Sequence, residues 1–143
     1  MAALTQAESI WTKTRLNARQ KLLTAAELRK FPALFATDKT PVAEKIPVAH
    51  FFGGPFDFYA VEFDRELGEF FGFTVIGGTG CEGEWGYQSV EALCRSSYRV
   101  EMVGADRGFN LGLERDLYWT PRPMREILPK VFGTTPASAL MEA

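Results

Sequence analysis

The chain has 143 residues, 46% of them hydrophobic and 24% charged, which is the composition of one globular domain and excludes a wholly disordered chain. The formal net charge of −2 gives no bulk electrostatic case for nucleic acid, and none for an acidic mimic of it. No stretch reaches the roughly 20 apolar residues that cross a bilayer, so we expect no membrane association and a cytoplasmic location.

The first thirty residues are basic and contain a helix pattern. Thr5 as N-cap with Glu8 three residues later predicts a helix over residues 5–20, with a thin apolar face. This helix either lies on the body or orders with a partner. The basic side chains are Lys13, Arg15, Arg19, Lys21, Arg29 and Lys30. We interpret them as a solvated surface beside an acidic body, and the alternative is a basic arm that touches phosphate.

A second capping box predicts a short helix further on. Thr24 is the N-cap and Glu27 follows three residues later, so the helix runs to about Phe31, where Pro32 helps to end it. Residues 36–47 hold prolines and mixed charges and predict a loop.

Strands follow the loop. Residues 48–52, 56–64 and 69–76 are rich in aromatic and branched side chains, and the last two ranges predict a hairpin with its turn at residues 64–68. Alternation along the middle strand puts Phe56, Phe58 and Ala60 on one face and Tyr59, Val61 and Phe63 on the other.

The glycine-rich residues 77–83 match neither phosphate-binding glycine pattern, which favours a hairpin loop. A short strand over residues 84–87 then leads to a helical turn capped by Ser89. Residues 95–108 predict an edge strand or an excursion, and residues 124–131 predict a terminal helix.

This order of elements predicts an α+β fold with a mostly antiparallel sheet of four to six strands and short flanking helices. We expect an N-terminal helical extension over residues 1–20, a single domain over residues 21–132 and a flexible tail over residues 133–143.

Residues 111–119, Leu-Gly-Leu-Glu-Arg-Asp-Leu-Tyr-Trp, place three adjacent charges inside an apolar run. As one strand, this segment directs Arg115 among large apolar side chains, where a carboxylate or backbone carbonyls must take up its donors. Glu114 and Asp116 then share the opposite face about 7 Å apart and can share a partner.

The residues that usually carry catalysis are few. His50 is the only histidine and lies in an apolar strand, which favours a structural role and excludes a His-cluster metal site. Cys81 and Cys94 match no metal or redox spacing, so we expect reduced thiols. The sequence gives no sign of a cofactor, a resident metal or a catalytic group.

Acidic and aromatic side chains are the remaining candidates. Carboxylates on neighbouring strands can hold a divalent cation, act as an acid and base, or neutralise Arg65, Arg95 and Arg115. Nearby aromatic side chains can line a pocket or an interaction surface. The candidate binding residues are Tyr59, Glu62, Glu84, Trp85, Tyr87, Glu114, Arg115 and Asp116.

An ordered series of short motifs covers about three quarters of the chain. They are Leu-Leu-Thr-x-x-Glu-Leu at residues 22–28, a Phe-Phe strand, aromatic-Tyr-Ala-x-Glu at residues 58–62, Phe-Phe-Gly at residues 70–72, the block at residues 84–93, and Glu-Arg-Asp-Leu-aromatic. In this order, residues 22–128 resemble the bacterial domain-of-unknown-function family 2958. The block departs from the family pattern at Trp85, where Leu is expected, and at Ala92, which is inserted.

The resemblance implies a small single-domain protein carried on plasmids, integrated elements or phages, with no activity to transfer. Small proteins in that setting often act by binding a host protein. We therefore expect a non-catalytic accessory or counter-defence factor that works by protein–protein interaction. The alternatives are a nucleic-acid-associated protein that uses the basic N-terminal helix, and a metal-dependent enzyme that uses the acidic strand face.

Overall fold

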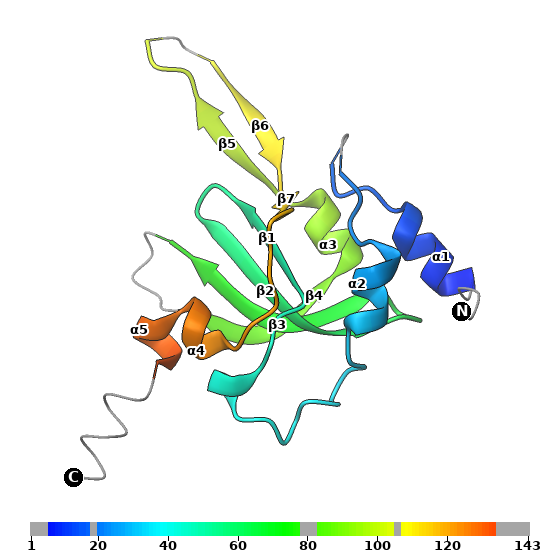
Figure 1. Cartoon of the computed structure of the whole chain (residues 1–143). Coiled ribbons are helices and arrows are strands. Elements are labelled where there is room, and N and C mark those ends of the chain that lie inside the picture. Colours follow the sequence, from blue (N-terminus) through cyan, green and yellow to red (C-terminus); the bar gives the residue numbers. More distant parts are fainter. Residues whose placement is uncertain (1–5, 18–19, 78–82, 105–106, 134–143) are drawn as a thin grey trace, which may run out of the picture.

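The computed structural model describes residues 6–17, 20–77, 83–104 and 107–133 (Figure 1). The helices are α1 (Gln6–Lys13), α2 (Ala25–Lys30), the 3-10 turn η1 (Val42–Glu44), α3 (Val90–Arg95), α4 (Met124–Ile127) and α5 (Pro129–Phe132). The strands are β1 (Ala49–Gly53), β2 (Phe56–Asp64), β3 (Glu69–Ile76), β4 (Glu84–Ser89), β5 (Ser97–Glu101), β6 (Gly108–Gly112) and β7 (Glu114–Arg115).

One antiparallel sheet of five strands organises the fold, in the order β4-β3-β2-β1-β7. Strands β5 and β6 form a separate two-stranded sheet, called the ribbon below, which extends away from the rest of the chain (Figure 1). The predicted α+β class is confirmed, and the predicted hairpin over residues 56–76 is confirmed as β2 and β3. Among the described residues, no helix is long and apolar enough to cross a membrane.

Each face of the sheet has its own hydrophobic core. On one face, Phe51, Phe58 and Phe70 pack with Leu28 of α2 and Leu93 of α3. On the other face, α4 and α5 bring Met124 and Phe132 against Tyr59 and Phe73. In Figure 1, α1, α2 and α3 lie on one side of the sheet and α4 and α5 on the other. Both faces of β2 are therefore covered.

The predicted alternation along β2 is wrong after Ala60. The pairing with β3 shifts between Ala60 and Glu62, which is a β-bulge that accommodates Val61. Beyond the bulge the faces exchange, so Phe63 packs in the same core as Phe58, and Glu62 joins the face of Tyr59. A bulge depends on the partner strand, and the alternation of one strand cannot reveal it.

The first helix is shorter than expected and packs on the body. It ends at Lys13, and a β-bridge then joins Arg15 to Lys21. Trp11 packs against the first core, and its indole N–H donates to the carbonyl of Arg65. The predicted N-cap Thr5 lies outside the described residues.

The second capping box is confirmed. The Thr24 side chain accepts from the backbone N–H of Glu27, and the Glu27 carboxylate accepts from the backbone N–H of Thr24. The predicted helical turn capped by Ser89 is also confirmed, because the Ser89 Oγ accepts from the N–H of Ala92.

The single strand predicted over residues 111–119 is wrong. Leu111 and Gly112 end β6 in the ribbon, Leu113 turns into the core, and β7 pairs with β1 in the large sheet. The segment therefore passes from one sheet to another, and Asp116 lies beyond the end of β7.

The predicted terminal helix divides in two. Pro129 has no N–H to continue a helix, so α4 ends at Ile127 and α5 begins at Pro129. Beyond Gly133, the predicted tail lies outside the described residues, as do residues 78–82 of the predicted glycine-rich loop.

Candidate functional site

The charged cluster around the only histidine is built by three separate elements. His50 comes from β1, Asp57 from β2, and Asp116 from the residues after β7. The His50 Nε2 lies 2.7 Å from Asp57 Oδ1, and the His50 Nδ1 lies 3.1 Å from Asp116 Oδ2. The His50 side chain is only 12% exposed, against 36% for Asp57 and 28% for Asp116. Each nitrogen of a mostly buried imidazole thus faces a carboxylate at the protein surface.

Aromatic rings surround this imidazole. The Tyr59 ring stacks on it with a centroid distance of 4.6 Å and an interplanar angle of 5°, and the Trp119 centroid lies 5.2 Å away. The Trp119 indole N–H donates to the carbonyl of Pro47, and the Arg122 guanidinium lies 4.7 Å from the Trp119 ring centroid. The rings fix the plane of the imidazole, so its nitrogens are aimed at the two carboxylates.

The environment of this cluster also raises the pKa of Tyr59. Its pKa is raised from 10.0 to about 12, first by burial and then by the negative charges of Asp57 and Asp116, while the positive charge of Arg122 opposes them. The Tyr59 phenol is therefore a poor acid near neutral pH.

This cluster joins separate chain segments, and it leaves neither ring nitrogen of His50 available for proton transfer to a substrate. A general base needs a ring nitrogen within reach of a substrate proton, and both nitrogens of His50 already have a carboxylate partner. The backbone N–H of Asp116 also donates to the carbonyl of His50 at 2.8 Å. We therefore interpret the cluster as a clamp between β1, β2 and residues 116–119.

The structure separates Glu114, Arg115 and Asp116. Glu114 pairs with Phe52, Arg115 forms an ion pair with Glu27 at 2.7 Å, and Asp116 turns to His50. The prediction that a carboxylate or backbone carbonyls take up the donors of Arg115 is confirmed, and the partner is the carboxylate of Glu27, which sequence reasoning did not identify. The predicted shared strand face of Glu114 and Asp116 is wrong, because β7 ends at Arg115.

Glu62 is a structural group. It is 2% exposed, and it accepts from the backbone N–H groups of Phe35 and Thr37 and from the Thr37 hydroxyl. The Lys45 ammonium donates to the same Thr37. These contacts hold the loop before β1 against the sheet.

The aromatic candidates of β4 lie together on the sheet. Trp85 stacks on Phe71 with a centroid distance of 5.5 Å, and Tyr87 lies 5.2 Å from the same ring. Glu84 pairs with Thr74 and projects to the opposite face of the sheet, away from Tyr59 and Glu62. The predicted binding residues therefore do not form one site but lie in separate parts of the structure.

Arg95 and Arg65 find their partners outside the predicted acidic residues. Arg95 pairs with Glu91 at 2.5 Å, and Arg65 donates to the carbonyls of Leu28 and Phe31. In the part of the chain that the structure describes, no group of three or more His, Cys, Asp or Glu side chains could hold a metal ion.

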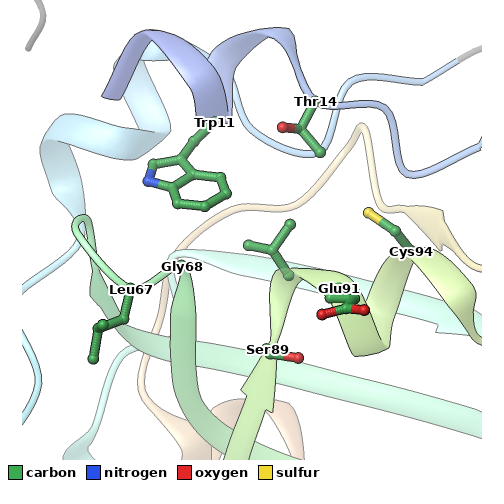
Figure 2. A pocket seen from close by; sticks show the side chains of 8 residues that line it. Trp11, Thr14, Leu67, Gly68, Ser89, Glu91 and Cys94 are labelled. Atoms are coloured by element: carbon green, nitrogen blue, oxygen red, sulfur yellow. The ribbon is translucent and has the colours of Figure 1, made fainter. Parts of the chain in front are cut away.

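A cleft of about 390 Å³ lies between α1 and α3 (Figure 2). Its lining includes Trp11, Leu67, Ser89, Glu91 and Cys94. The polar groups are engaged elsewhere, since Ser89 caps α3, Glu91 pairs with Arg95 and the Cys94 thiol donates to the carbonyl of Arg15. Burial raises the pKa of Cys94, which keeps it a thiol at neutral pH. This cleft therefore offers apolar contacts with little directional recognition.

Sequence reasoning missed the pairing of β5 with β6 in the ribbon. The register pairs Tyr98 with Leu111 and Val100 with Phe109, which puts four large apolar side chains on one face. The period-2 spacing within residues 98–102 and 109–111 was the signal that could have revealed it.

Comparisons with models of protein families, with curated proteins and with solved structures give no match to this chain. The resemblance to the domain-of-unknown-function family 2958 therefore stays a prediction.

Proposed function

We propose that this chain is a non-catalytic accessory protein that binds another protein through the apolar face of the ribbon. The observation that carries this proposal is a two-sided ribbon whose apolar side is only partly covered by the residues that the structure describes. Phe109 is 46% exposed and Leu111 is 41% exposed, and Val103 at the end of the ribbon is fully exposed.

The two faces of the ribbon differ in chemistry. Tyr98, Val100, Phe109 and Leu111 share one face, while Arg99, Glu101 and Asn110 share the other. Arg99 donates to Glu101 at 2.9 Å on the polar face. A strand pair normally buries its apolar face against a second layer. The missing layer is what a bound partner would supply.

The base of the ribbon continues this apolar surface onto the body. Tyr98 lies against Gly53, the last residue of β1, and against Gly54 in the turn that leads to β2. Together with Pro55 and Ile76 it lines a cleft of about 220 Å³. An isolated two-stranded ribbon is marginally stable in water, so a partner that packs on this face would also stabilise the ribbon.

The resemblance to family 2958 supports the context of the proposal. A small protein carried by a plasmid or phage would act in the cytoplasm of a bacterial host, and its partner would be a host protein such as a defence component. Aromatic and aliphatic anchors that enter a pocket supply most of the affinity in such interfaces.

The test is affinity capture from host lysate after nuclease treatment, with a matched pair of variants. Phe109→Asp places a charge on the apolar face, and Asn110→Asp places the same charge on the polar face of the same strand. We expect Phe109→Asp to lose a stoichiometric protein partner that the wild type and Asn110→Asp both retain. Equal capture by all three proteins, or no partner for any of them, would refute the proposal.

Nucleic acid is the second candidate, because the described basic side chains near the N-terminus are exposed. These are Lys13, Arg15, Lys21, Arg29 and Lys30. Binding through them would weaken steeply as salt increases. Fluorescence anisotropy with labelled duplex DNA at several salt concentrations measures this, and affinity that does not change with salt would exclude the basic surface.

A further inference from the structure

The two edges of the five-stranded sheet differ in how their outward backbone N–H and C=O groups are hydrogen-bonded. At the β7 edge, the Arg115 N–H donates to Gln20 Oε1 at 3.0 Å, and Gln20 Nε2 lies 3.4 Å from the Arg115 carbonyl. Asn17 Nδ2 donates to the Leu113 carbonyl at 3.0 Å. Side-chain amides therefore satisfy the backbone groups that a further strand would otherwise pair with.

Among the described residues, no side-chain amide satisfies the backbone groups at the β4 edge in this way. Residues 84–89 pair with β3 through six consecutive residue pairs without a register shift, and β4 is the last strand of the sheet. Sheet edges are usually protected by lysine, proline, a bulge or a covering segment. Glu-Trp-Gly-Tyr-Gln-Ser contains neither lysine nor proline, and no described strand pairs with its outer side.

We propose that β4 pairs with β4 of a second copy of this chain, antiparallel and across a two-fold axis at Gly86, so that two sheets become one. Residues directly opposite each other in an antiparallel pair have their side chains on the same face of the sheet. A two-fold axis perpendicular to the sheet keeps that relationship only if one residue lies opposite its own copy at the axis. With the axis at Gly86, Trp85 lies opposite Tyr87 of the second copy, and Glu84 lies opposite Gln88.

The side chains fit this register. Trp85 and Tyr87 already flank Phe71, so cross-strand pairing of Trp85 with Tyr87 would extend an aromatic cluster. Tyr87 is half-exposed in the single chain and would become covered. The Glu84 carboxylate can accept a hydrogen bond from the Gln88 amide of the second copy.

The axis position also accepts a side chain. A Cβ added at Gly86 would meet no atom within 4 Å, so a side chain introduced at the axis has room on the sheet face and need not displace the chain's own atoms. An axis at Tyr87 would instead leave Glu84 beyond the paired residues. This dimer is independent of the proposed function, because the ribbon belongs to a different sheet.

The first test measures the mass of the full chain by light scattering during size-exclusion chromatography across a concentration series. Gly86→Lys puts two like charges directly opposite each other at the axis, whereas Gly86→Thr puts two hydroxyl side chains there. We expect the wild type and Gly86→Thr to form a dimer, and Gly86→Lys to raise the dissociation constant about tenfold or more. Circular dichroism confirms that each variant is folded.

The second test determines the register of the β4 pair by disulfide cross-linking under oxidising conditions. It uses a chain in which Cys81→Ser and Cys94→Ser remove the native thiols. Two residues at the axis have Cα atoms about 4.5–5.5 Å apart, within the range of a disulfide. Gly86→Cys should therefore cross-link into a covalent dimer. The control Gln88→Cys should not, because its two copies lie four residues apart along the strand, about 13 Å.

A chain that stays monomeric at all concentrations would overturn the proposal. So would a dimer whose dissociation constant is unchanged in Gly86→Lys, or efficient cross-linking of Gln88→Cys in place of Gly86→Cys.

Discussion

His50 and Asp116 are joined twice, once through side chains and once through the backbone. The imidazole Nδ1 lies 3.1 Å from the Asp116 carboxylate, and the Asp116 N–H donates to the His50 carbonyl at 2.8 Å. Asp116 also accepts from the N–H of Tyr118 through its other oxygen. This pair fixes the path of the chain as it leaves the sheet towards the exposed Leu117 and Tyr118.

The first prediction concerns this pair. Asp116→Asn removes the charge but keeps the oxygen that accepts from Tyr118, and His50→Phe keeps the ring and removes both nitrogens. We expect each variant to lower the free energy of unfolding by about 1–3 kcal/mol. Urea denaturation of both single variants and the double variant should give a coupling energy of about 1 kcal/mol. Additive effects would show that the pair does not act as a clamp.

The second prediction concerns the ionisation of Tyr59. Its pKa of about 12 in the folded chain exceeds the 10.0 of an ordinary tyrosine, so the unfolded chain loses this proton first as pH rises. The stability that this group contributes is complete below pH 10 and is lost as pH rises to about 12. Ultraviolet absorbance titration should show a phenol that ionises near pH 12, and Tyr59→Phe should remove it. Asp57→Asn should lower its pKa, and an unchanged value would contradict the Asp57 contribution.

The third prediction concerns Arg115 and Glu27, whose side chains are 12% and 17% exposed. Arg115→Met leaves the carboxylate of Glu27 partly buried without its ion-pair partner, so we expect a loss of about 2–4 kcal/mol in the free energy of unfolding. The double variant Arg115→Met, Glu27→Leu should lose less than the sum of the two single variants. Guanidinium denaturation measures all three, and a strictly additive result would argue against coupling.

The fourth prediction concerns the backbone strain at Phe35. Its φ of 70° lies in the left-handed region, and its side chain is 63% exposed. Phe35→Gly removes the steric cost of a Cβ in that conformation and should raise the free energy of unfolding by about 1 kcal/mol. Phe35→Ala keeps the Cβ and serves as the matched control. Thermal denaturation that ranks the alanine variant above the glycine variant would contradict this account.

Much of the fold was predictable because it depends on neighbours in sequence. The Thr24 and Glu27 capping box, the cap at Ser89 and the turn between β2 and β3 each need only three to five consecutive residues. The interruptions were not predictable in the same way. The bulge at Val61 and the transfer of residues 111–115 between sheets are set by strands elsewhere in the chain.

The same distinction between local and long-range features applies to the candidate site. Tyr59 and Asp116 were candidates from sequence, and His50 was interpreted as structural, but nothing in the sequence joined them. Asp57 was missed because its closeness to His50 arises from the pairing of β1 with β2. Similarly, Glu27 was assigned only its capping role, although its second oxygen holds Arg115.

By itself, the sequence determined the α+β class, the positions of the caps and turns, and the need of Arg115 for acceptors from a carboxylate or backbone carbonyls, because propensity, capping and burial cost act locally. Only the tertiary structure decided which carboxylate meets which cation, which face the residues after Val61 occupy, and which sheet edge stays open. Those outcomes depend on strand pairing between distant segments, which brings together backbone and side-chain groups that no spacing along the chain can specify.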